Sequence, residues 1–288
     1  MFAELKPHLE RILDTPILEY SPVHGGDISK AYEVFTPKSK FFVKTSTEPW
    51  AEDLFIAEAK GLEQLGATKT IKVPKVYHYG RINGNGYLVL EFVDRKNPNT
   101  EDFRLLGRKL AELHLTSTSS TFGAKENNFI GHLPQNNIMS ENWAEFYVGM
   151  RIESQLEIAV NKGLLSEESV PPKEKTLKIC NSIIGPVKSS LLHGDLWSGN
   201  FLIAKDGTPH LIDPSVYHGH SEVDIAMSRL FGGFDSSFYK AYYDIMPKHD
   251  NPHEITEIYQ LYYLLVHLNL FGNTYRNAVL SILDRYFR

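Results

Sequence analysis

The chain has 288 residues, 42% of them hydrophobic, so it can bury the core of one large domain or of two lobes. Its 30 basic and 35 acidic residues give a net charge of -5, which argues weakly against a nucleic-acid-binding surface. No apolar run reaches the length of a membrane span, and the N-terminus lacks a signal-peptide core. Cys180, the single cysteine, cannot form an internal disulfide, which fits a reducing compartment. We therefore expect a soluble cytoplasmic protein with no nucleic-acid or membrane partner.

The first part of the chain combines short strands with two helices. Apolar residues at helical spacing predict a helix over residues 1 to 14 and a second one that contains Glu58 and ends at Gly66. Apolar runs bounded by turn residues predict five strands, over residues 17–20, 31–35, 40–45, 73–79 and 86–93. We expect these strands to form an antiparallel sheet with one inserted helix.

A glycine turn separates the first two predicted strands. It consists of Gly25, Gly26, Asp27, Ile28 and Ser29. Paired glycines let a backbone approach phosphates closely, and exposed amides bind anions. However, the turn is not Gly-x-Gly-x-x-Gly, and most Gly-Gly pairs are plain hairpin turns. Alone, it is a weak indication of a phosphate loop.

Lys44 continues the third strand at a position where a lysine usually faces solvent. It also resembles the strand lysine that contacts nucleotide phosphates in kinases, which needs a carboxylate partner on the next helix. Glu58 is favoured as that partner because its small neighbours Ala57 and Ala59 allow a buried position. The sequence leaves the choice open among Glu58 and three competing acids, Glu52, Asp53 and Glu63.

The fifth strand ends in Glu91, Phe92 and Val93, and a polar segment follows. We interpret these three residues as a hinge whose backbone meets adenine and the polar segment as a lobe boundary. A core strand followed by an exposed loop fits the sequence equally well. The predicted lobes are residues 1–93 and residues 94–288.

The second predicted lobe is mainly helical. Helical spacing predicts helices over residues 101–116, 143–160, 175–188, 222–230, 238–245, 255–271 and 278–287. A loop as long as 117–140 is usually functional or disordered in a compact domain. Its segment 128–137 mixes polar groups with apolar anchors, which suits contact with a polar substrate. We expect His114 to be a packed or capping histidine.

A polar stretch between short apolar runs carries the chemistry. It reads His193-Gly194-Asp195-Leu196-Trp197-Ser198-Gly199-Asn200, and Asp213 follows a later apolar run. In phosphoryl transfer a carboxylate accepts the proton of the attacking hydroxyl, while an amide and a second carboxylate hold Mg²⁺ against the nucleotide phosphates. Asp195, Asn200 and Asp213 offer these groups. Such residues also commonly cap turns. The flanking strands and the upstream Lys44 favour phosphoryl transfer over that interpretation.

Asp224 lies near the start of the predicted helix 222–230, where an acid commonly caps the helix. It can also brace the loop around His193 by accepting backbone amides, and both interpretations can hold. Three further histidines have uneven spacing and no accompanying cysteine, so we do not expect zinc at His210, His218 and His220.

These residues resemble the fructosamine kinase family, also called ketosamine-3-kinases, within the aminoglycoside phosphotransferase and protein-kinase-like superfamily. The resemblance covers nearly the whole chain, and its hallmark is the stretch 193–200, in which Trp197 separates the family from choline and aminoglycoside kinases. Similar segments are Gly25 to Ser29, Phe122-Gly123, residues 128–131, 134–137 and 143–156, Ile212-Asp213-Pro214 and residues 217–224. It implies an α+β, protein-kinase-like two-lobe fold, with a five-stranded antiparallel sheet plus a helix in the N-lobe and a mainly helical C-lobe.

The resemblance implies ATP-dependent phosphorylation of a ketosamine, free or on a protein lysine, at the sugar 3-hydroxyl. The product sheds its sugar, so the implied role is deglycation. In this interpretation Asp195 orients and deprotonates the hydroxyl, and Asn200 and Asp213 hold Mg²⁺. Lys44 holds phosphate and is oriented by Glu58.

The resemblance also assigns the phosphate loop to Gly25 through Ser29, adenine binding to the backbone of Glu91 to Val93, and part of the sugar pocket wall to Trp197. Many members carry cysteine where this chain has Asp27, which argues against a redox switch there. Two alternatives stay open: a kinase of an aminoglycoside- or choline-type substrate, and a catalytically silent nucleotide-binding scaffold. The sequence decides neither the sugar (fructosamine, ribulosamine or erythrulosamine) nor the oligomeric state.

Overall fold

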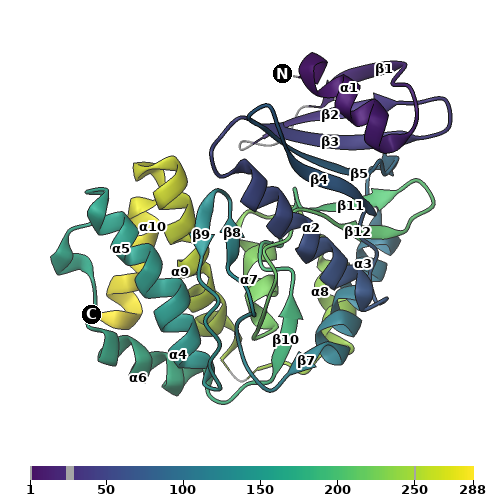
Figure 1. Ribbon diagram of the computed structural model, residues 1–288. Helices are drawn as coiled ribbons and strands as arrows, with labels where there is room; N and C mark the ends of the chain where they lie inside the picture. Colours follow the sequence, from purple (N-terminus) through teal and green to yellow (C-terminus); the bar gives the residue numbers. More distant parts are fainter. Residues whose placement is uncertain (1, 24–28, 250) are drawn as a thin grey trace. The chain divides into compact units, whose positions relative to one another are not determined.

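The computed structural model describes residues 2–23, 29–249 and 251–288 (Figure 1). The chain divides into two compact units, one formed by Met1–Asn97 with Leu202–Pro214 and the other by Pro98–Phe201 with Ser215–Arg288. The first unit thus includes a short segment from the later part of the chain. The lobe boundary expected between residues 93 and 94 stays a prediction.

The first unit is built on a five-stranded antiparallel sheet in the order β1-β2-β3-β5-β4. Its strands are β1 (Glu19–Val23), β2 (Lys30–Phe35), β3 (Lys40–Ser46), β4 (Val76–Ile82) and β5 (Asn85–Glu91). The predicted antiparallel sheet with an inserted helix is therefore confirmed. The first and fourth strands begin a few residues later than expected. In the fourth, Pro74 lies inside the expected strand and cannot donate to a strand ladder.

Side chains of β3 alternate between two separately packed faces of this sheet. Val43 packs in an apolar cluster with residues of α1 (Phe2–Leu13), whereas Lys44 bonds to Glu58 of α2 (Ala51–Ala67). Successive strand residues point to opposite faces, so one strand serves both the core under α1 and the polar group at α2.

A second, three-stranded sheet in this unit joins distant parts of the chain. Its order is β12-β11-β6, with β6 (Arg95–Lys96), β11 (Phe201–Ala204) and β12 (Pro209–Leu211). The amide of Leu211 donates to the carbonyl of Lys72, just after α2, at 2.9 Å. This bond anchors the segment that ends in Asp213 beside the residues that follow α2.

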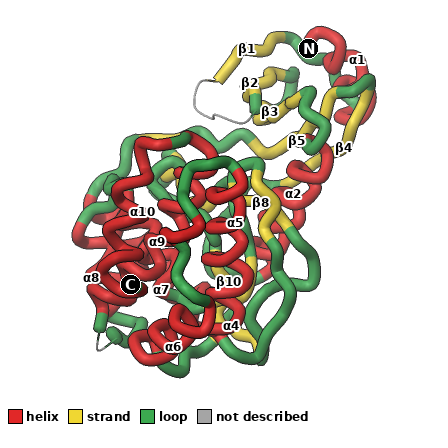
Figure 2. Tube along the Cα trace, turned by 90° about the vertical axis from the view of Figure 1, so that its left-hand side faces the viewer, coloured by secondary structure: helices red, strands yellow, loops and turns green. Residues whose placement is uncertain are grey.

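The second unit is mainly helical (Figure 2). Its α-helices are α3 (Thr100–Thr116), α4 (Trp143–Tyr147), α5 (Ser154–Asn161), α6 (Lys173–Ile184), α7 (Glu222–Leu230), α8 (Ser236–Tyr243), α9 (Pro252–Phe271) and α10 (Arg276–Ile282). Short 3₁₀ turns lie at Glu167–Ser169 and Asn273–Tyr275, and π-helical turns at Val148–Glu153 and Leu283–Phe287. The predicted helix 175–188 ends early because Gly185, with φ +67°, and Pro186 cannot continue it.

The long segment expected to be a loop over residues 117–140 contains regular structure. It holds β7 (Thr118–Ser119) and a hairpin of β8 (Asn128–Ile130) and β9 (Leu133–Gln135). β7 pairs with β10 (Ser189–Leu192), which also pairs with β13 (Tyr217–Gly219).

Of the helices that the structure describes, none combines the length and the apolar character needed to cross a membrane.

Gly107 of α3 gives a direct test of the packing of α3 on α8. A Cβ atom at Gly107 would lie 2.3 Å from the backbone oxygen of Phe238, whereas one at Gly149 would meet nothing nearer than the Glu153 side chain at 4.0 Å. We predict that Gly107→Ala lowers the free energy of unfolding by about 2–4 kcal/mol, because the backbone of Phe238 must move. Gly149→Ala should be neutral or stabilising, by about 1 kcal/mol at most. Urea denaturation measures both, and equal stabilities would contradict the close approach of α3 and α8.

Glu222, at the start of α7, predicts a pH dependence of stability. Its side chain is buried and accepts a hydrogen bond from the hydroxyl of Tyr243 at 2.8 Å. Burial raises the pKa of Glu222 from 4.5 to about 7. Folding therefore favours the protonated form. This contribution to stability is complete below pH 4.5 and is lost as the pH rises through about 7.

Glu222→Gln keeps the acceptor for Tyr243 and removes the titration. The unfolding free energy of the variant should therefore rise relative to wild type, by about 2–3 kcal/mol in total, as the pH increases from about 4 to about 8. Urea titrations across this range measure the difference. Parallel curves for the two proteins would show that Glu222 does not titrate in this way.

Candidate active site

In the first unit, Lys44 contacts two carboxylates. Its ammonium lies 2.8 Å from Oε1 of Glu58 and also donates to Oδ1 of Asp213. Glu58 is thus the acid on α2 that reaches Lys44, one of the four that the sequence left open. The contact joins β3, α2 and the segment 202–214 at one point.

Lys44 stays charged at this point although it is buried. Burial alone favours its neutral form, but the carboxylates of Asp213 and Glu58 outweigh burial and raise the pKa of Lys44 above its ordinary value. Burial raises the pKa of Glu58, and the ammonium of Lys44 opposes that rise. The outcome is a fixed ammonium group suited to bind an anion.

Asp213 has an unusual backbone. Its φ is +53°, in the left-handed region that Asp tolerates better than bulkier residues do. Its side chain is 43% exposed even though one oxygen contacts Lys44. Strained residues cluster at functional sites, so this conformation supports a role for Asp213 beyond packing.

In the second unit, the predicted catalytic stretch forms a tight loop after β10. Asn200 donates its amide nitrogen to the backbone oxygen of Asp195 at 2.9 Å and to the carboxylate of Asp195 at 3.1 Å. Gly194 has φ +84°, and a Cβ there would lie 2.1 Å from the backbone oxygen of Ser215, so only glycine fits. The loop therefore holds the half-exposed Asp195 in a defined orientation.

Asp224 holds the backbone of this loop from α7. Its carboxylate accepts the amides of His193 at 2.8 Å and Gly194 at 2.9 Å. Burial disfavours its charge, but hydrogen bonds with His114 and the loop hold the pKa of Asp224 below its ordinary value. The bracing contact considered for Asp224 from the sequence is present in the structure.

Two residues make contacts near the loop that were not predicted from the sequence. His114 does more than pack, because its Nε2 lies 3.2 Å from Asp224 and its Nδ1 lies 2.9 Å from the Tyr242 hydroxyl. Tyr263 of α9 donates its hydroxyl to the backbone oxygen of Gly194 at 2.9 Å. Their partners lie more than 60 positions away along the chain, so helical spacing could show only that both residues face inward.

Trp197 is the exposed aromatic residue of the loop. It is 39% exposed, and its ring lies over Gly199, where a Cβ would approach the ring to 2.3 Å. Gly199 therefore lets the indole lie flat against the loop. A large apolar surface that is only partly covered is available to a ligand.

The remaining predicted residues lie in the first unit. Glu91 ends β5, where its amide donates to Lys75 at 2.8 Å, and half-buried Phe92 and Val93 follow it. Ser29 lies half-buried directly before β2. The rest of the predicted phosphate loop, Gly25, Gly26, Asp27 and Ile28, lies outside the described residues.

Two amide side chains of segment 128–137, where we expected contact with substrate, face the protein interior instead. Gln135 and Asn137 are buried, at 2% and 0% exposure, and they bond to protein groups. Among the described residues, no group of three or more His, Cys, Asp or Glu side chains is arranged to hold a metal ion. His220 instead bonds to Tyr259 and His249 at 2.7 and 2.9 Å.

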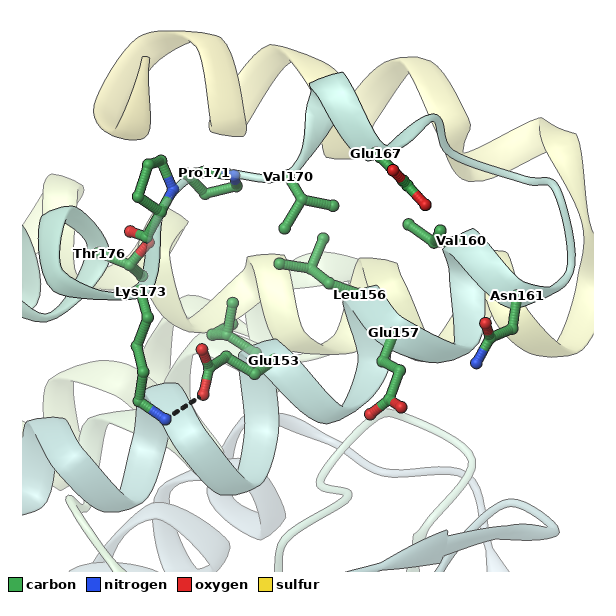
Figure 3. A pocket seen from close by; sticks show the side chains of 12 residues that line it. Glu153, Leu156, Glu157, Val160, Asn161, Glu167, Val170, Pro171, Lys173 and Thr176 are labelled. Carbon is green, nitrogen blue, oxygen red and sulfur yellow. Dashed lines mark hydrogen bonds and ion pairs between the residues drawn. The ribbon is translucent and has the colours of Figure 1, made fainter.

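A groove elsewhere in the second unit contains none of the predicted site residues. It has a volume of about 630 Å³ and lies between α5 and the start of α6 (Figure 3). Leu156 and Val170 point into it, and Glu153 and Lys173 pair at one end at 2.5 Å. It is separate from the loop that carries Asp195.

The chain is similar to known proteins over its whole length. The family model for fructosamine kinase matches residues 1–288. The "Protein-ribulosamine 3-kinase, chloroplastic" of Arabidopsis thaliana is 38% identical over 281 residues, which cover 95% of this chain and 84% of the relative.

Solved structures agree with this assignment. The crystal structure titled "Putative fructosamine-3-kinase" from Haemophilus somnus has a TM-score of 0.88 at 29% identity and covers 99% of this chain and 97% of its own. An aminoglycoside phosphotransferase, APH(4)-Ia, in a complex with ADP and hygromycin B, has a TM-score of 0.65 at 14% identity, with 98% of each chain covered. That likeness shows the predicted protein-kinase-like fold. The chain belongs to the fructosamine kinase family and is a phosphotransferase that uses a hydroxyl group as acceptor.

Proposed function

We propose that this protein is an ATP-dependent ketosamine kinase that phosphorylates the 3-hydroxyl of its sugar, leading to deglycation. The relative from Arabidopsis is named for phosphorylating protein-bound ribulosamine, which supports this substrate class. The observation that carries the proposal is the fixed, half-exposed carboxylate of Asp195 on a loop whose backbone is braced by Asp224.

Asp195 is the proposed general base. Its carboxylate accepts the proton of the sugar hydroxyl as that oxygen forms a bond to the terminal phosphorus of ATP, and the bond to the ADP oxygen breaks. The hydrogen bond from Asn200 fixes the orientation of one carboxylate oxygen. General-base catalysis by such a group contributes a factor of about 10²–10⁴.

Lys44 is the proposed phosphate ligand, oriented by Glu58. Its ammonium is buried, charged and fixed between two acids, so it can bind a phosphate oxygen without first being ordered. The turn from Gly25 to Ser29 is the proposed phosphate loop, and the backbone of Glu91 to Val93 is the proposed adenine contact.

Asn200 and Asp213 are the proposed magnesium ligands, and their donor atoms fit this ion. Both hydrogen bonds of the Asn200 side chain use its amide nitrogen, so its amide oxygen faces away from Asp195. The Asp213 carboxylate is partly exposed. Mg²⁺ prefers oxygen donors and is commonly held by one or two side chains plus substrate phosphates. When bound, it would neutralise charge on those phosphates.

The exposed ring of Trp197 is the proposed wall of the sugar pocket. An aromatic ring packs well against the apolar C–H face of a sugar. In this proposal Asp195, two positions earlier in the chain, accepts a hydrogen bond from a sugar hydroxyl.

A substrate panel tests the function. Fructosamine, ribulosamine and erythrulosamine derivatives of one lysine, each free and within one protein, are incubated with ATP and Mg²⁺ beside an aminoglycoside and choline. We expect ADP release with at least one ketosamine and a phosphate on its 3-hydroxyl. Turnover confined to the aminoglycoside or choline would support those alternatives, and no turnover with any acceptor would support a silent scaffold.

Asp195→Asn tests the mechanism with the best acceptor from that panel. We predict that kcat falls by about 10²–10⁴-fold because the base is lost, while equilibrium binding of ATP is retained. Asp206→Asn, in the exposed turn between β11 and β12, is the matched control and should keep wild-type activity. Near-normal turnover by Asp195→Asn would remove Asp195 as the base.

A further inference from the structure

Arg151 is a buried cation in the second unit. Its side chain is 0% exposed and lies in the π-helical turn Val148–Glu153 between α4 and α5. No carboxylate pairs with it in the part of the chain that the structure describes. A buried charge is costly unless its hydrogen-bonding groups are satisfied, so an unpaired guanidinium in a core needs an explanation.

Neutral groups surround the Arg151 guanidinium instead. Its Nη1 donates to the backbone oxygen of Asn136 at 2.6 Å, and its Nη2 donates to Oδ1 of Asn137 at 2.7 Å. The guanidinium carbon lies 4.0 Å from the centroid of the Tyr217 ring and 4.7 Å from that of Phe146. A planar fork of donors stacked on aromatic rings fixes the segment that it binds in one position.

From Asn137, a chain of buried amides leads away from Arg151. Asn137 donates to Oδ1 of Asn128 at 2.8 Å, and Gln135 donates to the same oxygen at 2.7 Å. Asn128 donates to the backbone oxygen of Val216 at 2.8 Å, and Gln135 reaches that of Ser215 at 3.3 Å. The amides that suggested a substrate contact in the sequence therefore hold the backbone of residues 215–216.

Those residues support the catalytic loop. The amide of Ser215 donates to the backbone oxygen of His193 at 2.8 Å, and the close approach of Ser215 to Gly194 excludes any larger side chain there. Helix α9 reinforces this path at two points. Tyr262 donates to Oε1 of Gln135 at 2.5 Å, and the next residue, Tyr263, donates to the backbone oxygen of Gly194.

We propose that Arg151 is a positioning residue for phosphoryl transfer. It acts through the amides of residues 128–137 and through Ser215 to fix the backbone of His193 and Gly194, which precede Asp195. It touches neither substrate nor nucleotide in this account. A geometric error in a catalytic group lowers the rate even when binding is intact, so the effect should fall on kcat.

Arg151→Met and Arg151→Lys test this inference in the full-length protein. Gln155→Met is the matched control, because Gln155 lies one helical turn further on, is also buried, and accepts a hydrogen bond from Asn269 of α9 at 2.9 Å, away from the path. Activities are expressed per folded molecule, and the folded fraction is measured by circular dichroism. The acceptor is the one that the wild type phosphorylates fastest. If the proposed substrate class is wrong, the wild type itself fails to phosphorylate ketosamines, whereas an effect of Arg151 shows as a difference between variant and wild type.

We expect Arg151→Met to lower kcat by about 10- to 100-fold with an unchanged KM for ATP. Arg151→Lys keeps the charge but not the planar fork of donors, so its kcat should lie between those of Arg151→Met and wild type. Gln155→Met should keep the wild-type kcat. A wild-type kcat in Arg151→Met, or an equal loss in Gln155→Met, would overturn the inference by showing that Arg151 acts only on stability.

Tyr262→Phe keeps the test decisive if Arg151→Met does not fold. This variant removes only the hydroxyl that bonds Gln135 and leaves the ring in the core. A several-fold lower kcat, with faster hydrogen exchange at the amide of Ser215, is the expected result. An unchanged kcat together with unchanged exchange at Ser215 would overturn the proposed path.

Discussion

The contact between the ammonium of Lys44 and two carboxylates holds together the candidate site residues of the first unit. It joins β3, α2 and the segment that ends at Asp213, and Lys44 and Asp213 are 169 positions apart in sequence. Burial favours loss of the charge, and the two acids prevent it. The two acids thus fix the position of the Lys44 side chain and keep it cationic, which is the state that a phosphate ligand needs. Without the segment 202–214, one of the two compensating acids would be missing.

In the second unit, contacts from several elements fix the loop that carries the half-exposed Asp195. Four contacts to the loop that carries this acid are made to backbone groups. Asp224 accepts two loop amides, Tyr263 binds the oxygen of Gly194, and Ser215 binds the oxygen of His193. Aromatic and amide side chains behind the loop hold its backbone and that of residues 215–216.

Local patterns predicted much of this fold, because strand alternation and helical spacing report directly on which residues are buried. The five strands, α2 and the long helices were predictable for that reason, as was the stretch around Asp195. Patterns could not separate Glu58 from its three competitors, since that choice depends on which side of α2 faces β3. They also could not identify the partners of the amides in residues 128–137. A run of amides looks the same in sequence whether its partners belong to a ligand or to the protein.

The measurement that tests the central claim most directly is equilibrium binding of ATP and of adenosine to wild-type protein and to Lys44→Met, with folding checked by circular dichroism. If the lysine held between Glu58 and Asp213 binds phosphate, the substitution should weaken ATP binding by about tenfold or more, the cost of one charge-assisted hydrogen bond, and leave adenosine binding unchanged. Equal affinities of the two proteins for ATP, or an equal loss for ATP and adenosine in folded Lys44→Met, would contradict the account.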